Sequence, residues 1–135
     1  MTAAVLGAGS TLQLEAGSPA TFTTIAEVLR CGPIGSTAPE VDVTNLDSTA
    51  KEYIAGLPDG NTVEFEFNWT KTAQQTDLRD SVGSTRTFRM VWADSPSTQA
   101  TFQMAVLQFD INETTPENQI TARASGRITG DITWA

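Results

Sequence analysis

The sequence contains no histidine and a single cysteine, Cys31. Without histidine there is no imidazole to serve as a general base, to complete a catalytic triad or to hold a metal ion. One cysteine forms no internal disulfide and does not make a cysteine-rich zinc site. We therefore expect no metal, no cofactor and no enzymatic activity.

Basic residues and long hydrophobic runs are also scarce. Eight Lys and Arg stand against sixteen Asp and Glu, a net charge of −8, which argues against binding nucleic acid through its phosphates. The longest apolar runs, such as residues 90–93, are far shorter than the roughly 20 residues that span a bilayer. The first residues lack the basic start and apolar segment of a signal peptide. The expectation is a soluble, acidic, cytosolic protein without a membrane association.

Threonine and period-two alternation are abundant instead. The chain has 21 threonines, a residue that favours strands over helices. The clearest strand covers residues 120–134, where apolar and polar residues alternate to the end. Within it Gly126 and Gly130 predict a bend or a close approach of another backbone.

Further strands and one helix follow from the same patterns. Clean alternation predicts strands over 61–69 and 86–92, and the segment 101–112 is predicted to be a strand covered on both faces or one interrupted by a bulge near Ala105. Shorter strands are expected over 11–15, 22–29 and 40–46. A helix is predicted over 73–82, capped by Thr70 or Thr72, ended by Gly83, and packed through Leu78 and Val82.

The balance of elements predicts a mainly β fold. Many strands and one short helix indicate a β-sandwich or barrel with one short flanking helix, formed as a single domain over residues 1–135. Two segments lack a regular pattern. Residues 45–59 form a long connection, the kind of loop that often carries function, and residues 1–9 have the composition of a flexible N-terminal arm.

Two groups of side chains are candidate sites. Glu64 and Glu66 share the polar face of a strand, and we interpret them as part of a solvated face rather than as an acid–base pair. Trp69, Trp92 and Trp134 have the chemistry to stack on sugars, but each continues an apolar alternation, so core packing is the stronger interpretation.

Several stretches, taken in order, resemble one protein family. They are the segment FTTIAEV at 22–28 followed by Gly32-Pro33, then VDVTNLDS at 41–48, KEYIAGLPDG at 51–60 and the alternating VEFE at 63–66. This order resembles the major tail tube protein of long-tailed, non-contractile bacteriophages. The likeness covers nearly the whole chain, and the stretches VTNLDS and IAGLPDG are its most specific parts.

The resemblance implies a structural virion protein. Its subunits would form a β-sandwich with a flanking helix, close into hexameric rings and stack into the hollow phage tail tube through which double-stranded DNA passes during ejection, without binding it specifically. The implied partners are further copies of the chain, a tape measure protein and the tail tip and terminator proteins. The protein would be made in the host cytoplasm and reside in the virion. Larger members of the family carry a C-terminal immunoglobulin-like domain, which we expect to be absent here.

The resemblance also gives the candidate residues their roles. We expect Glu64 and Glu66 to face the lumen, where negative charge repels phosphates, with Arg123 and Arg127 as possible cross-strand partners that would make the wall milder. The loop 45–59 is a candidate for inter-subunit or inter-ring contact, or alternatively folds back onto its own sheet. Its candidate contact residues are Asp47, Lys51, Glu52, Tyr53 and Ile54.

Two other interpretations remain open from the sequence. One is a monomeric, secreted, immunoglobulin-like module for carbohydrate binding or adhesion, against which the missing signal peptide and disulfide count. The other is a different phage structural part, such as a tail terminator or a head decoration protein.

Overall fold

The computed structural model describes residues 7–17 and 21–135 of the chain. In these residues strands dominate and a single helix is present, which confirms the mainly β prediction. Seven strands form one antiparallel sheet in the order β2-β1-β9-β10-β11-β8-β3. Their bounds are β1 (Thr11–Ala16), β2 (Thr21–Thr24), β3 (Val28–Gly32), β8 (Thr62–Asn68), β9 (Thr85–Val91), β10 (Gln99–Ile111) and β11 (Thr121–Trp134).

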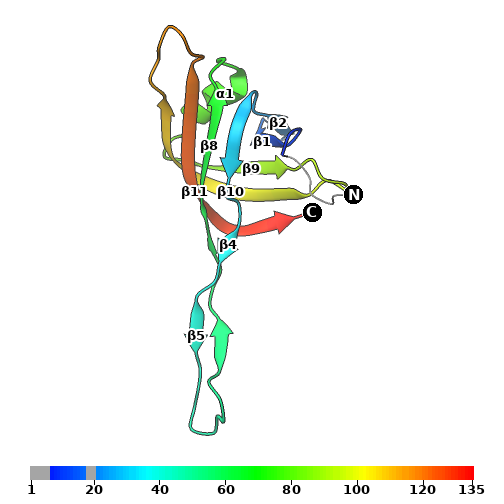
Figure 1. Ribbon diagram of the computed structural model, residues 1–135, viewed down its shortest axis with the longest axis vertical. Helices are drawn as coiled ribbons and strands as arrows, with labels where there is room; N and C mark the ends of the chain where they lie inside the picture. Colours follow the sequence, from blue (N-terminus) through cyan, green and yellow to red (C-terminus); the bar gives the residue numbers. More distant parts are fainter. Residues whose placement is uncertain (1–6, 18–20) are drawn as a thin grey trace.

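The sheet curls into a half-barrel because its two longest strands, β10 and β11, bend along their length. Figure 1 shows β3 and β8 running upright while β9 lies across them, with β10 and β11 turning from one direction to the other. The bulge expected near Ala105 is found between Val106 and Gln108, where the register of β10 on β11 shifts. Because the extra residue, Leu107, points outward, Phe109 turns back toward the core.

The two glycines of β11 occupy the irregular parts of this strand. A Cβ on Gly126 would clash with the carbonyl oxygen of Ala105 on β10, so the predicted close backbone approach is confirmed. Gly130 has a φ of +77° and lies where the register shifts a second time. These two irregularities let the long strand β11 bend, so that it follows the curl of the sheet.

The core fills the concave side of the half-barrel. Side chains that alternate inward along all the long strands make one cluster, with stacked and tilted aromatic pairs at its centre. Its largest fully buried members are Phe65, Phe67, Phe88, Leu12, Leu14, Ile25, Leu78 and Met104. The tryptophan prediction is only partly met: Trp69 and Trp92 pack against the core, but Trp134 is 54% exposed.

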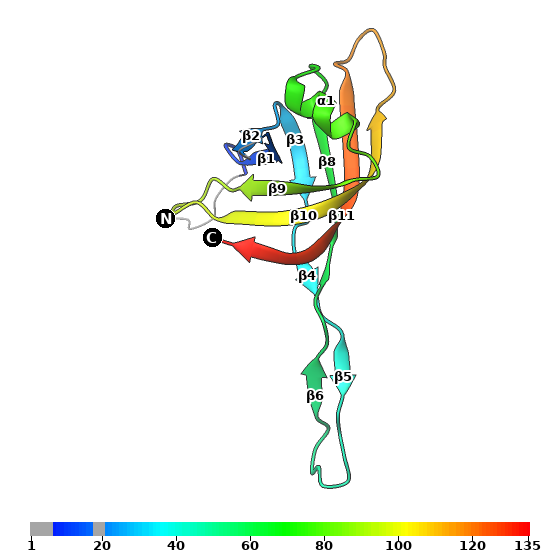
Figure 2. The same ribbon diagram turned by 180° about the vertical axis from the view of Figure 1, so that it is seen from behind.

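The helix α1 (Ala73–Arg79) covers one end of the half-barrel (Figure 2). Thr72 caps it by accepting a hydrogen bond from the Gln75 N–H, as one of the two expected caps. The helix is shorter than predicted, and the predicted apolar stripe is half wrong: Leu78 is buried, whereas Val82 lies beyond the helix and is exposed. The second buried residue of the helix is Gln75.

Gln75 is tolerated in the core because all its polar atoms are used. Its Oε1 accepts from the Thr70 N–H at 2.9 Å, and its Nε2 donates to the carbonyl oxygens of Asn68 at 2.9 Å and Ala26 at 3.1 Å. The side chain therefore ties the helix to the end of β8 and to the turn before β3.

The predicted strand over 22–29 is wrong, because two strands occupy this region. β2 pairs with β1 at one edge of the sheet and β3 pairs with β8 at the other. Between them Ile25 enters the core and Glu27 adopts a φ of +57°, which turns the chain. Within this short segment the chain thus crosses from one edge of the sheet to the other.

The strand over 40–46 and the loop over 45–59 also need correction. Both belong to a two-stranded ribbon, residues 36–60, which we call the arm and which projects from the sheet (Figures 1 and 2). In the arm β4 (Ser36–Thr37) pairs with β7 (Asp59–Gly60), and β5 (Glu40–Asp42) pairs with β6 (Tyr53–Ala55). Sequence alternation missed the return strands because each is only two or three residues long.

Candidate functional site

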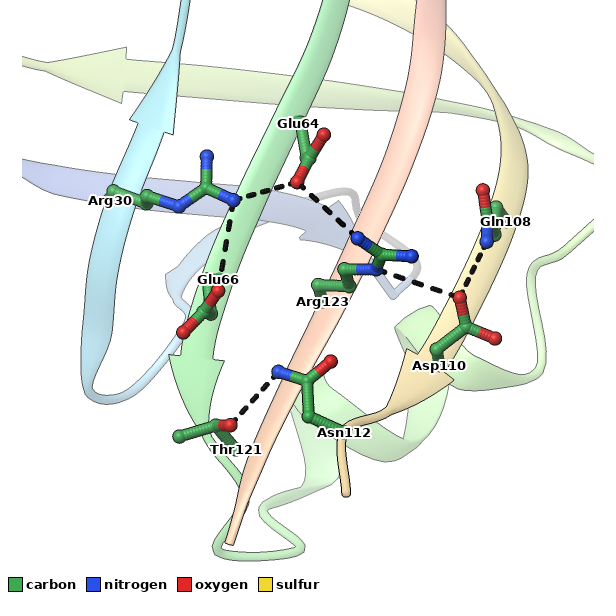
Figure 3. A network of polar contacts seen from close by, with 8 residues as sticks. All are labelled: Arg30, Glu64, Glu66, Gln108, Asp110, Asn112, Thr121 and Arg123. Carbon is green, nitrogen blue, oxygen red and sulfur yellow. Dashed lines mark hydrogen bonds and ion pairs between the residues drawn. The ribbon is translucent and has the colours of Figure 1, made fainter. Parts of the chain in front are cut away.

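The first candidate surface is a row of alternating charges on the outer face of the sheet. The strand register places Arg30 of β3 opposite Glu66 of β8, Glu66 opposite Arg123 of β11, and Arg123 opposite Asp110 of β10. Glu64 lies two residues from Glu66 on the same face. We call these five residues the charged face, and Figure 3 shows their side chains turned toward one another.

Each arginine of the charged face bridges two carboxylates. Arg30 Nη2 lies 2.7 Å from Glu64 Oε1 and 3.7 Å from Glu66 Oε2. Arg123 lies 4.0 Å from Glu64 through Nη1 and 3.7 Å from Asp110 through Nε. The hydrogen bond that Arg30 donates to Glu64, with the charges of both glutamates, raises the pKa of the Arg30 guanidinium above its ordinary value. The network therefore crosses four neighbouring strands without interruption.

This arrangement holds the surface near neutrality. Two arginines and three carboxylates sum to one net negative charge, although the whole chain carries −8. Because every guanidinium is directed at a carboxylate of its own sheet, neither presents a free cation to a phosphate. The charged face therefore carries little net charge, so a charged molecule can touch it without being held.

The sequence identified the glutamates but not all of their partners. Of the two expected partners, Arg123 is in place, whereas Arg127 pairs with Asp59 at the root of the arm. The principal partner, Arg30, was missed because the predicted strand ended before it and nothing local indicates that β3 lies beside β8. Only the long-range pairing of these strands brings Arg30 to the glutamates.

The second candidate surface is the arm. Opposite residues on its two strands share a face, so Val41 and Ile54 lie together on one side, with Val43 next in line, and Asp42 and Tyr53 lie on the other. All five side chains are exposed. A two-stranded ribbon on its own is marginally stable in water, and exposed apolar groups along it favour a protein partner.

The tip of the arm is a structured turn. The Thr44 N–H donates to Asp42 Oδ1 at 2.9 Å, and hydrogen bonds from Thr44 lower the pKa of the Asp42 carboxyl. The Asn45 N–H donates to Ser48 Oγ, whose hydroxyl donates to Glu52 Oε2 at 2.8 Å. At its apex Leu46 is 104% exposed, so a rigid turn presents a bare aliphatic side chain to solvent.

The structure brings the five candidate loop residues together in this outer part of the arm. Asp47 donates its N–H to Asn45 Oδ1, and Glu52 donates its N–H to Thr44 Oγ1 and accepts Val43 N–H through its carbonyl oxygen. Lys51 is exposed, as are Tyr53 and Ile54 on β6. The alternative in which this loop folds back onto its own sheet is not adopted, since the arm extends away from it (Figure 2). Of the expected N-terminal arm, residues 1–6 lie outside the described residues.

A third feature is an aromatic pocket at the ends of β9 and β11. The rings of Trp92 and Trp134 stack with centroids 5.9 Å apart and planes 18° from parallel. They line a pocket of about 340 Å³ together with Gly7, Ser10, Ala93, Asp94 and Thr98. Thr98 donates hydrogen bonds to both carboxylate oxygens of Asp94 and thereby lowers its pKa.

Two kinds of site are not found in the described part of the chain. Across residues 7–17 and 21–135 no cluster of three His, Cys, Asp or Glu side chains is arranged to hold a metal ion. The same residues contain no helix of the length and apolarity needed to cross a membrane. Cys31 packs against the core, where burial raises the pKa of its thiol to about 12.

Similarity to known proteins is found in the fold and not in the sequence. No family model and no curated protein sequence matches the chain. A chain in the tail of an empty gene transfer agent particle, refined with C6 symmetry, superposes with a TM-score of 0.72 at 18% identity, covering 98% of this chain and 99% of its own length. A chain of the SPP1 tail tube superposes with a TM-score of 0.69 at 12% identity, covering 97% and 78%.

The chain has a tail tube fold. A chain of the anti-feeding prophage baseplate, determined with 6-fold symmetry, shares the fold over 100% of this chain, with a TM-score of 0.74 at 9% identity. The fold that the resemblance to phage tail tube proteins implies is thus confirmed by structures of tails and a baseplate. The similarity covers 97–100% of this chain in the three structures.

Proposed function

We propose that this protein is the structural subunit of a phage tail tube. Copies of the chain close into hexameric rings, and the rings stack into a hollow tube that forms part of the virion. Double-stranded DNA passes through the tube during ejection. The role is architectural and involves no catalysis.

The full-length tail tube fold is the observation that carries this proposal. The match extends from one end of the described chain to the other, and the related tail of the gene transfer agent particle was refined with C6 symmetry. A sheet with open edges, such as those formed by β2 and β3, is protected when neighbouring copies cover it. Closure into a ring is the arrangement by which identical subunits do this.

The arm supports assembly as the contact between copies. It exposes apolar side chains on a ribbon that gains little stability from its own chain, and a neighbouring copy would bury them. We assign Asp47, Lys51, Glu52, Tyr53 and Ile54 to this contact between subunits or rings. We expect assembly to be stabilised by the burial of the arm's apolar side chains, which are exposed in the isolated subunit.

The charged face supports the role of conduit. We assign Glu64 and Glu66 to the lumen, with Arg30 and Arg123 between and beside them. A lining of paired charges repels phosphates weakly and attracts them nowhere, so that DNA slides past. The lumen is therefore mild in charge rather than strongly acidic.

The assembled tube implies further partners. A tape measure protein would set its length, and tail tip and terminator proteins would close its two ends. The subunit would be made in the host bacterial cytoplasm and incorporated into the tail there.

Electron microscopy with light scattering on the purified protein tests the proposal. We expect hollow tubes or six-fold rings at high concentration in negative stain. A sample that remains monomeric by scattering and featureless in the microscope, with binding to an immobilised glycan panel, would overturn the proposal in favour of a carbohydrate-binding or adhesion module.

A further inference from the structure

The arm ends in an aliphatic side chain that has no partner in its own chain's body. Leu46 is fully exposed at the apex of the tip turn. The hydrogen bonds of Asp42, Thr44, Asn45, Ser48 and Glu52 fix this turn. Ordering the turn in advance reduces the entropy lost on docking, as expected of a segment built to insert into something.

The body carries a pocket whose chemistry suits such a side chain. Stacked Trp92 and Trp134 form its apolar wall, and small residues, Gly7, Ser10 and Ala93, leave room between them. A volume of about 340 Å³ is ample for one branched aliphatic group. The exposure of Trp134, unusual for a tryptophan in line with core residues, is explained if another chain covers it.

The two surfaces carry charges of both signs. Asp94 is the one charged group among the described residues that line the pocket. Lys51 is the only cation in the arm sequence, which otherwise carries five carboxylates, and it lies in the tip loop. The tip carboxylates of Asp42 and Glu52 already accept hydrogen bonds within the turn. Lys51 is therefore the tip group whose charge is opposite to that of Asp94, whereas the exposed Asp47 carboxylate, next to Leu46, has the same sign.

The pocket and the tip of one chain do not meet. In Figures 1 and 2 the tip lies at the far end of the arm, whereas the C-terminus, next to Trp134, lies beside the sheet. We propose that the tip of the arm, with Leu46 as its anchor, docks into the Trp92–Trp134 pocket of a second copy of this chain. This inference rests on the proposed tube function and specifies which surfaces join the copies.

A double-mutant cycle on assembly tests the contact. Leu46→Ser and Trp134→Ser should each raise the critical concentration for tube formation roughly ten- to hundredfold, since each removes the burial of one large apolar group per subunit. The critical concentration of the double variant should be no higher than that of the more severely affected single variant, because both substitutions remove the same contact. Val82→Ser, which changes an exposed residue beyond α1, should assemble like the wild type and serves as the control.

Cross-linking in tubes gives a second, direct readout. In a Cys31→Ala background, Leu46→Cys combined with Ala93→Cys should give a ladder of covalent multimers with a short bismaleimide, and Leu46→Cys combined with Val82→Cys should not. If wild-type tubes form while the two serine penalties multiply and the first cysteine pair gives no ladder, the docking assignment is wrong and the tube function stands. If the wild type forms neither tubes nor rings, both fall.

Discussion

At the scale of single residues, the fold depends on a few side chains that ordinary patterning does not reveal. Gln75 is the clearest, since it is fully buried yet satisfies three backbone groups at the joint between α1 and the sheet. In the sequence, a glutamine after a helix cap is typical of a solvent-exposed position. Only the structure shows why Gln75 is buried, because the end of β8 and the turn at Glu27 come together around it.

Gln75→Leu should destabilise the protein by about 3 kcal/mol, because the Thr70 N–H and the carbonyls of Ala26 and Asn68 would lose their partner inside the protein. Urea unfolding of the monomer measures this. Gln74→Leu, the same change one residue earlier and less buried, is the matched control. Equal effects of the two substitutions would show that the buried hydrogen bonds do not stabilise the joint.

Gly126→Ala should also destabilise the fold, by about 2–3 kcal/mol, since the added Cβ meets the backbone oxygen of Ala105 and not a side chain that can rotate away. We expect a lower thermal midpoint than for Ser125→Ala on the adjacent, outward-facing position. A midpoint unchanged from the wild type would mean that β10 and β11 separate at this point without cost.

At the scale of elements, one ion pair fastens the helix to the sheet. Arg86 of β9 contacts both carboxylate oxygens of Asp77, at 2.9 and 2.8 Å, and also reaches Ser81 Oγ and the Glu15 carbonyl. The hydrogen bonds from Arg86 lower the pKa of the Asp77 carboxyl. The partly buried guanidinium of Arg86 on β9 therefore links this strand to α1 and β1.

The stabilisation from this pair should depend on pH in a defined direction. A carboxyl whose pKa is lower in the folded state stabilises the fold above its unfolded pKa, about 3.9, and loses that contribution as the pH falls through the folded value. Asp77→Asn should cost about 1 kcal/mol at pH 7, a figure reduced for its partial exposure. Unfolding free energies of the two proteins should converge below about pH 4.

Asp80→Asn is the control for this prediction, because Asp80 pairs with Arg79 on the exposed side of the helix. It should change stability little at either pH. A constant difference between wild type and Asp77→Asn across the acid range would contradict the assigned origin of the stabilisation.

The tip of the arm should tolerate a deletion without loss of the half-barrel. Deleting residues 48–51 shortens the tip turn, whose hydrogen bonds lie within the arm itself, so the body should unfold with the wild-type midpoint. The same deletion should abolish tube growth. Circular dichroism and negative-stain microscopy on one sample measure the two outcomes, and tubes of normal length from the deleted chain would show that the arm is not the contact.

The strands with long alternation were predictable, and the short or crossing ones were not. Residues 120–134 and 61–69 alternate because one face of each meets the core, and this signal is local. The division of 22–29 between two sheet edges, and the return strand at Tyr53–Ala55, depend on pairings far apart in sequence. The same holds for the site: Glu64 and Glu66 were found from alternation, whereas Arg30 was not.

At the scale of the whole molecule, the acidic charge is unevenly distributed. The arm carries five carboxylates and one lysine, half of the net charge of −8, while the charged face is nearly balanced. In the proposed tube the paired charges of the charged face point toward DNA. The excess of carboxylates on the arm lies partly in contacts between copies. Net charge alone therefore does not describe the lumen.

Reversing the balance of the charged face should slow DNA passage. Glu64→Lys with Glu66→Lys removes both carboxylates that hold Arg30 and adds two cations per subunit, which would bind phosphates in the lumen. Tubes should still form, since the face is not in the core. Phage particles built with this variant should eject DNA more slowly, most clearly at low salt, and ejection at the wild-type rate would show that this face is not luminal.

The most direct measurement is a helical cryo-electron microscopy reconstruction of the purified protein assembled at high concentration. We expect a hollow tube of stacked six-fold rings, with Glu64 and Glu66 lining the bore and the arm of each subunit resting on another copy. A solid filament, a tube with the charged face on its outside, or a protein that stays monomeric at every concentration would contradict this expectation.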